Sequence, residues 1–97
     1  MPFAILTFDK ADHAELRTRL RPDHVAYLLT RQGIMLAGGA MLDEAGRPHG
    51  GLILIDTDDH ALAEDFAAND PFNKGGLFET VNVVRWRKSF FDFQTFF

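Results

Sequence analysis

The stretch that decides the fold lies at residues 34–56 and reads "IMLAGGAMLDEAGRPHGGLILID". Apolar runs at 34–42 and 52–56 flank the segment 43–51, "DEAGRPHGG", which consists of turn-forming residues from end to end. Two apolar runs of strand length joined by such a loop predict an antiparallel hairpin. Working outward, a helical segment lies on each side of the hairpin, and a further strand lies beyond each helix.

The first of these outer strands is "FAILTF" at 3–8, and the last strand is expected over 77–88. After the first strand, Asp12 and Glu15 have the spacing of a helix-capping pair. Pro22 predicts a break near 20–21 and a fresh helix over 22–32, with Gly33 as its C-terminal cap. The expected buried positions of that helix follow helical spacing: Val25, Leu28 and Leu29.

The second helix is expected to begin at Asp58 or Asp59 and to bury Leu62, Ala63 and Phe66. The element order is therefore βα-ββ-αβ, which is the split βαβ or ferredoxin-like pattern. The predicted fold class is α+β, with a four-stranded antiparallel sheet and both helices on one face. A length of 97 residues fits a single domain over residues 1–97.

The strands carry apolar residues on both faces, which two helices cannot cover. Phe3 and Ile5 alternate with Ala4, Leu6 and Phe8. An antiparallel sheet with one solvated face would instead alternate apolar and polar residues. This pattern predicts a homodimer that forms through the sheet face without helices.

The C-terminal segment 90–97, "FFDFQTFF", holds five of the ten phenylalanines of the chain. Left in water, these rings would form an apolar patch that soluble monomers rarely tolerate. The tail is therefore expected either to fold back on its own domain or to pack on a partner subunit, and the uncovered sheet face favours the partner.

Composition excludes several classes of function. The net charge of −4 disfavours nucleic acid as a partner. No apolar run approaches the ~20 residues of a membrane span, and no signal segment is visible, so a cytoplasmic protein is expected. The chain has no cysteine, and its glycine-rich segments lack nucleotide-binding spacings. No cofactor or metal site is expected, because His13, His49 and His60 form no HxxH or HxxxH pair.

The candidate chemistry begins at residues 69–72, "NDPF". Pro71 predicts that the second helix stops at about Asn69 and that Asp70 is extended. A carboxylate at the C-terminal end of a helix faces the negative end of its dipole, so Asp70 breaks a local rule. The topology brings Asp70 and His24 to the end of the sheet where the first strand finishes. Such a pair suits acid–base chemistry, although a half-buried structural histidine and a solvated aspartate remain an alternative.

Three segments carry a resemblance to a known family: "ELRTRLRPDHVAYLLTRQGIMLAGGAM", "GGLILID" and "FAANDPFNKGGLFETVNVVRWRKSF". Their motifs and spacing resemble the YciI-like, or YCII-related, proteins over roughly residues 3–90. The resemblance implies a ferredoxin-like dimer whose proposed active-site histidine and aspartate fall on His24 and Asp70. Arg17 matches the upstream arginine of the family and Gly38 its strand glycine. This chain has Gly39 where the family often has proline.

These observations together predict a small-molecule enzyme. His24 is expected to be the general acid/base and Asp70 its orienting partner, with Arg17, Gly38 and Phe72 in the substrate site. Arg17 and Arg21 are candidates to hold a carboxylate or phenolate of the ligand, with solvated arginines at a helix end as the alternative, and Arg17 is expected to be the anion holder. The expected chemistry is elimination, isomerisation or hydrolysis of a small organic acid, lactone or ring hydroxyl compound. The alternative is a dimeric metabolite-binding or interaction module that performs no catalysis.

Overall fold

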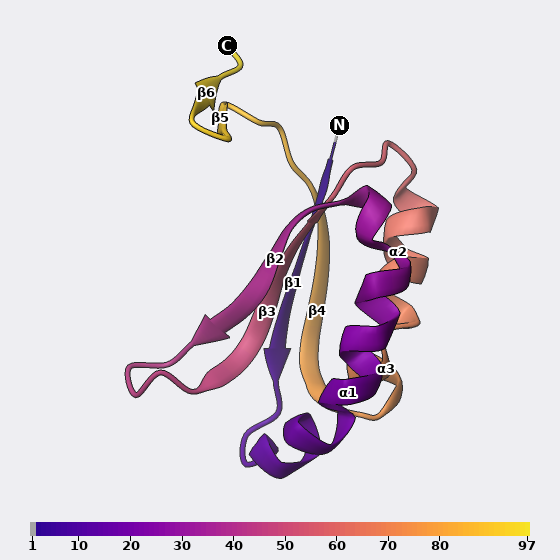
Figure 1. The fold of residues 1–97 in the computed structure, drawn as a ribbon, viewed down its shortest axis with the longest axis vertical. Coiled ribbons are helices and arrows are strands. Elements are labelled where there is room, and N and C mark those ends of the chain that lie inside the picture. Colours follow the sequence, from indigo (N-terminus) through magenta and orange to yellow (C-terminus); the bar gives the residue numbers. More distant parts are fainter. Residues whose placement is uncertain (1) are drawn as a thin grey trace.

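The computed structural model describes residues 2–97 and has an α+β architecture, shown in Figure 1. One antiparallel sheet has the strand order β2-β3-β1-β4. Its strands are β1 (Phe3–Asp9), β2 (Met35–Leu42), β3 (Pro48–Ile55) and β4 (Phe78–Arg85). This order agrees with the predicted ferredoxin-like class, because β1 and β3 are the two central strands and β2 and β4 are the edges.

Three α-helices lie on one face of this sheet (Figure 1). They are α1 (Ala14–Thr30), α2 (His60–Ala68) and the single-turn α3 (Pro71–Lys74), and a short 3-10 helix, η1 (Gln32–Ile34), follows α1. The end of β1, the β2–β3 loop and α3 all lie at the same end of the molecule (Figure 1). Asp70, which precedes α3, therefore lies at the end of the sheet where β1 finishes, as the topology predicted.

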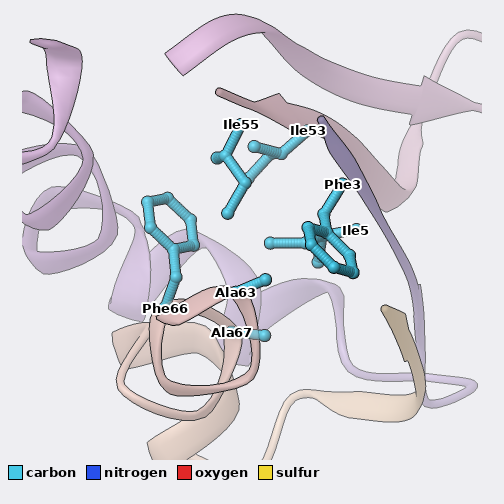
Figure 2. Packing of buried hydrophobic residues seen from close by; sticks show 7 residues of the cluster. All are labelled: Phe3, Ile5, Ile53, Ile55, Ala63, Phe66 and Ala67. Atoms are coloured by element: carbon cyan, nitrogen blue, oxygen red, sulfur yellow. The ribbon is translucent and has the colours of Figure 1, made fainter. Parts of the chain in front are cut away.

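The hydrophobic core lies between the sheet and α2, as Figure 2 shows. Alternate positions of β1 and β3 face α2 because side chains along a strand point to opposite faces. The buried cluster is Phe3, Ile5, Ile53, Ile55, Ala63, Phe66 and Ala67. The small alanines let the backbone of α2 approach the strands closely, while α1 contributes only the partly buried Tyr27 and Leu28 to this cluster.

The predicted helix break at 20–21 is wrong, because α1 runs without interruption from Ala14 to Thr30 and contains Pro22. Proline lacks an N–H and leaves the carbonyl four residues earlier, that of Thr18, without its helical partner. Both Thr18 and Pro22 are exposed, so water can hydrate that carbonyl. The helix therefore tolerates a proline that a buried helix face would not.

The predicted caps of this helix are also wrong. Asp12 has a φ of 61° and lies outside the helix, while His13 occupies the N-cap position without a side-chain cap. Aspartate tolerates the left-handed region better than most residues, which lets the chain reverse sharply between β1 and α1. At the other end, the backbone N–H of Arg31 closes the helix, and Gly33 lies inside η1.

Several boundaries and burials differ from expectation. The hairpin loop is shorter than 43–51, because β3 already begins at Pro48, and β4 ends at Arg85 rather than near 88. Leu62 and Leu29 are 40% and 64% exposed rather than buried, and no residue of α1 is fully buried. Helical spacing identifies an apolar side of a helix, but it does not reveal that an open cavity lies beneath α1.

The sheet face without helices carries apolar residues on β1 and β3, while β4 adds Asn82 and Thr80 to it. Leu52 lies opposite Leu6, and Val84 lies opposite Ala4, so these residues share the face of Phe8. Phe8, Leu52 and Val84 are 41%, 42% and 48% exposed. The expected apolar patch is therefore present on the single chain.

The C-terminal tail forms a small hairpin, β5 (Phe90–Phe91) and β6 (Gln94–Thr95), beyond the end of the sheet where β4 ends (Figure 1). Asp92 and Phe93 have positive φ values and make its turn. Phe93 and Phe97 are almost fully exposed. The tail does not fold back to cover the core in this structure.

Among the helices of residues 2–97, none is long and apolar enough to cross a membrane.

Candidate active site

A cavity of about 460 Å³ lies between α1 and the sheet, and it contains the residues singled out from the sequence. One wall is the side of α1 that carries Arg17, Arg21 and His24. The opposite wall is formed by β1, β2 and β3, and the segment from α2 to α3 closes one side. The size is within the range of small-molecule pockets, which is roughly 300–1,000 Å³.

His24 and Asp70 meet in this cavity, although 46 positions separate them in the sequence. The distance between His24 Nδ1 and Asp70 Oδ1 is 2.7 Å. The side chains are 16% and 6% exposed, so the pair is largely shielded from water. The structure thus brings together the two residues that the sequence analysis paired.

Asp70 is held in place by its position between two helices. It is extended, as Pro71 predicted, but it also caps α3, which the sequence analysis missed. Its Oδ1 accepts the backbone N–H of Phe72 at 2.9 Å, and Pro71 occupies the first turn, where proline is favourable. Asp70 therefore lies at the positive N-terminal end of a helix, and the supposed violation of the dipole rule is removed.

The hydrogen bonds of Asp70 assign the tautomer of His24. A carboxylate has only acceptor atoms, so His24 Nδ1 donates the proton in their hydrogen bond. The remaining ring nitrogen, Nε2, then carries a lone pair in the neutral imidazole. That arrangement gives the cavity a group that can accept a proton.

Phe72 fixes the plane of the imidazole. Its ring stacks on His24 with the centroids 3.8 Å apart and the planes at 10°. Phe72 is buried, and its ring also meets Phe78 edge-on. The predicted substrate-site residue Phe72 thus lies in the cavity wall and restricts rotation of His24.

Arg17 lies on the same side of α1 as His24, since seven residues are about two helical turns. Its Nη1 donates to Asp9 Oδ2 at 2.6 Å, and its guanidinium carbon lies 4.8 Å from the centre of the Phe72 ring. Both side chains of the Arg17–Asp9 pair are mostly buried. Within residues 2–97 the second oxygen, Asp9 Oδ1, is buried without a hydrogen-bond partner.

The sequence analysis missed Asp9 and Thr7, which is buried and lines the cavity. The alternation of β1 contained a signal for both. Thr7 and Asp9 continue the positions of Phe3 and Ile5, which face the helices. A polar residue at such a position either needs a buried partner or faces a cavity.

Gly38 keeps the sheet side of the cavity open. A Cβ atom there would lie 3.3 Å from Met35 Cε and 3.6 Å from Ile53 Cγ1. Gly38 therefore lines the cavity, as expected for a substrate-site residue, and its missing side chain leaves room beside β2.

The other three histidines lie apart from this cavity. His13 bonds the carbonyl of Ala11, His49 contacts Phe8, and His60 pairs with Glu64 at 3.0 Å. Across residues 2–97, no group of three histidine, aspartate or glutamate side chains is arranged to hold a metal ion.

The solved structures that match this chain include two proteins of related architecture. The 5-chloro-2-hydroxyhydroquinone dehydrochlorinase of Burkholderia phenoliruptrix, in complex with 2,5-dihydroxybenzoquinone, matches with a TM-score of 0.83 and 27% identity. The match covers 90% of this chain and 94% of that chain. An antibiotic biosynthesis monooxygenase matches with a TM-score of 0.53 and 16% identity, over 91% of this chain and 100% of that chain, which shows a shared fold alone.

Comparison of sequences gives the family. The YCII-related domain matches residues 1–87. Protein YciI of Escherichia coli O6:H1 is 32% identical over 98 residues, covering 93% of this chain and 100% of that protein. Protein YciI of Shigella flexneri matches with the same identity and coverage. With most of its length inside that domain and with relatives of this similarity, the chain belongs to the YCII-related family.

Proposed function

We propose that this protein is a small-molecule enzyme that uses His24 as its general acid/base and Asp70 as the partner that orients it. The observation that carries the proposal is the 2.7 Å hydrogen bond between His24 Nδ1 and Asp70 Oδ1 inside the cavity. An imidazole titrates near neutral pH and can both take and give protons. With Nδ1 donating to a carboxylate, Nε2 faces the substrate as a base.

The substrate class is a small ring hydroxyl compound, organic acid or lactone. The cavity volume suits a single-ring molecule, and its walls are mostly apolar. The dehydrochlorinase that resembles this chain acts on a chlorinated hydroxyhydroquinone, which supports ring hydroxyl compounds as the first class to test. Arg17, Gly38 and Phe72 are proposed to contact the substrate from three sides of the cavity.

The proposed reaction type is elimination. His24 Nε2 takes a proton from the substrate, the electron pair of the broken bond forms a new double bond, and the leaving group departs with its own electron pair as an anion. Asp70 stabilises the imidazolium that forms, because a carboxylate beside a ring nitrogen favours the charged state. His24 then releases the proton to solvent and returns to its starting state.

We further propose that the protein acts as a homodimer that forms through the helix-free sheet face. Phe8, Leu52 and Val84 leave apolar surface exposed there on the single chain. Burying apolar surface contributes about 25 cal/mol per Å², so covering this face is favourable. A second copy offers the same apolar surface under twofold symmetry.

The catalytic proposal is tested with 5-chloro-2-hydroxyhydroquinone and a panel of small lactones and ring acids. Chloride release and product formation are measured for the unaltered protein, His24→Ala, Asp70→Asn and the double variant. We expect each single change to lower kcat by roughly 10²–10⁴-fold, since a positioned acid–base group contributes about that much. The double variant should lose little more, because the two residues act as a unit.

Two controls separate chemistry from folding. Asparagine at position 70 retains an oxygen that can cap α3, so Asp70→Asn should change unfolding free energy by less than about 1 kcal/mol. His13→Ala removes a histidine outside the cavity and should leave kcat unchanged. Full turnover in His24→Ala would disprove the proposal. Ligand binding without turnover of any compound would favour the metabolite-binding module instead.

A further inference from the structure

The charges that line the cavity are not balanced among themselves. The ionisable residues in its wall are Arg17, Arg21, His24 and Asp70. His24 and Asp70 bond each other, and Arg17 forms its ion pair with Asp9. Among the ion pairs of residues 2–97, none includes Arg21. Arg21 is thus the cavity cation without an acidic partner in the part of the chain that is described.

The environment of Arg17 makes it a poor first choice for holding a ligand anion. Its side chain is 15% exposed, and its charge is already matched by the carboxylate of Asp9 at 2.6 Å. Drawing Arg17 toward a ligand would leave a mostly buried Asp9 unpaired, and an unpaired buried charge is costly. The contact with the Phe72 ring adds a second restraint on its position. Arg17 is therefore suited to holding Phe72, and through it His24, in place.

Arg21 has the opposite properties. It lies one turn after Arg17 and one turn before His24, so the three residues share one side of α1. It is exposed and lines the cavity, so a ligand can reach its guanidinium without displacing an existing ion pair. A guanidinium presents several N–H groups in a plane and suits two-point contact with a carboxylate or another anionic oxygen.

We propose that Arg21 is the anion-binding group of this cavity and that it holds an ionised oxygen substituent of a small ring compound. The apolar body of the ligand would lie between Val25 and Leu28 of α1 and Ile53 of β3, all of which line the cavity. This inference rests on the proposed function for the location of the substrate site. It adds two points to that function: Arg21 replaces Arg17 as the anion holder, and the substrate is an anion. Since Arg21 is about one helical turn from His24, the anionic substituent is placed beside the group that moves the proton.

The test is calorimetric titration with two pairs of probes that differ in charge. Benzoate and benzamide have nearly the same shape, and only benzoate is an anion. The second pair, ionised 2,5-dihydroxybenzoquinone and neutral hydroquinone, tests a ring oxygen in place of a carboxylate. Each probe is titrated into the unaltered protein, Arg21→Gln and the matched control Arg19→Gln, which removes the same charge from an exposed residue of α1 outside the cavity wall.

We expect at least one anionic probe to bind the unaltered protein more tightly than its neutral counterpart. Arg21→Gln should weaken that anion by roughly 10–100-fold, which is the effect of losing a hydrogen bond to a charged group, and should leave the neutral probe unchanged. Arg19→Gln should bind every probe as the unaltered protein does. Loss of benzoate alone would identify a carboxylate, and loss of the dihydroxybenzoquinone alone would identify an ionised ring oxygen.

Three results would overturn the inference: no preference for either anion over its neutral counterpart, unchanged anion binding in Arg21→Gln, or equal weakening in Arg19→Gln. Binding is measured without turnover, so this outcome is independent of the kinetic test of His24. If His24→Ala is fully active and Arg21→Gln loses anion binding, the proposed anion-binding role of Arg21 is supported. The proposed catalytic role of the His24–Asp70 pair is then disproved.

Discussion

Gly50 of β3 pairs with Phe8 of β1 and leaves no room for a side chain. A Cβ atom there would lie 2.2 Å from the carbonyl oxygen of Thr7 and 2.8 Å from Met41 Cε. Because the first of these atoms is backbone, Gly50→Ala must push the two strands apart. We expect the unfolding free energy to fall by about 1–3 kcal/mol, the usual cost of overpacking.

The matched control is Gly39→Ala, a strand glycine whose added Cβ would meet nothing within 4 Å. Alanine is favoured over glycine in a strand by roughly 0.5–1 kcal/mol, so this variant should be as stable as the unaltered protein or slightly more stable. Urea denaturation of both variants provides the comparison. Equal stability of the two variants would show that the strands relax around Gly50 without cost.

The sequence predicted which residues form the candidate site, but it did not predict the contacts that each of them makes. His24 and Asp70 could be paired because topology and family motifs both brought them together. The ion pair between Arg17 and Asp9 could not be predicted in this way, since it depends on how α1 lies over the end of β1. The role of Asp70 as the N-cap of α3 could not be predicted, because α3 is a single turn and is too short to show a periodic pattern.

At the scale of elements, Pro22 within α1 carries a measurable cost. A proline inside a helix is less favourable than alanine by about 3 kcal/mol, and it recovers roughly 0.4–1 kcal/mol by restricting the unfolded chain. The difference between the two effects leaves Pro22→Ala with an unfolding free energy higher by about 2–2.6 kcal/mol, measured by urea denaturation.

Pro71→Ala is the control for this prediction. Pro71 lies in the first turn of α3, where proline is favourable, so its replacement should lower stability or leave it unchanged. If both proline replacements stabilised the protein equally, the gain would not come from the helix interior.

Asp43 gives the β2–β3 loop a dependence on pH. Its Oδ1 accepts the backbone N–H groups of Ala45 and Arg47. The hydrogen bond from the Arg47 backbone, together with the smaller effects of Ala45 and nearby positive charges, holds the pKa of Asp43 below its ordinary value. A carboxylate with a lowered pKa stabilises the folded state above its unfolded pKa, and the contribution is lost as pH falls through the folded pKa.

The expected readout is a difference between two stability curves. The stability advantage of the unaltered protein over Asp43→Ala should be constant near neutral pH and should shrink on acidification below about pH 4, the unfolded pKa of an aspartate. Thermal unfolding of both proteins between pH 7 and pH 3 measures it. A difference that is independent of pH would show that ionisation of Asp43 does not matter for the loop.

The type and order of the main elements followed from the sequence, while their boundaries did not. The alternation of turn residues and apolar runs fixed β1 to β4 because each run is of strand length. The predicted helix boundaries at Pro22 and Gly33 were wrong, because α1 continues through Pro22 and ends before Gly33. Propensity is a weak guide at one residue, and tertiary context overrides it.

At the scale of the whole molecule, the proposed dimer can form with its twofold axis either along the strands or across them. An axis along the strands brings the two tails to the same end, together with the basic residues Arg85, Arg87 and Lys88 of both copies. An axis across the strands places each tail at the partner's opposite end, where Phe8 and His49 contact each other and the loop carries Asp43 and Glu44. Like charges repel and opposite charges attract, so the crossed arrangement is expected.

Disulfide trapping distinguishes the two arrangements, because the chain contains no cysteine. The crossed arrangement predicts that a chain carrying Ser89→Cys and Glu44→Cys forms disulfide-linked dimers on mild oxidation. Position 44 is in the β2–β3 loop and position 89 directly precedes β5, and these two segments lie at opposite ends of the molecule, so the two cysteines cannot bond within one chain (Figure 1). Ser89→Cys alone should remain unlinked, whereas efficient linkage of that single variant would support an axis along the strands.

The tail itself is expected to contribute to this interface. Burial of a phenylalanine side chain is worth roughly 1.5–3 kcal/mol, and Phe90, Phe93 and Phe97 are each at least 66% exposed on the single chain. Deleting residues 90–97 should therefore weaken the dimer, seen by light scattering as a fall in mean mass on dilution, while β1 to β4 retain their core. The hairpin of β5 and β6 lies at the opposite end of the molecule from α3 (Figure 1), and no residue of 90–97 lines the chain's own cavity. A truncated chain that remains fully dimeric at every concentration, with unchanged thermal stability, would place the tail outside the interface.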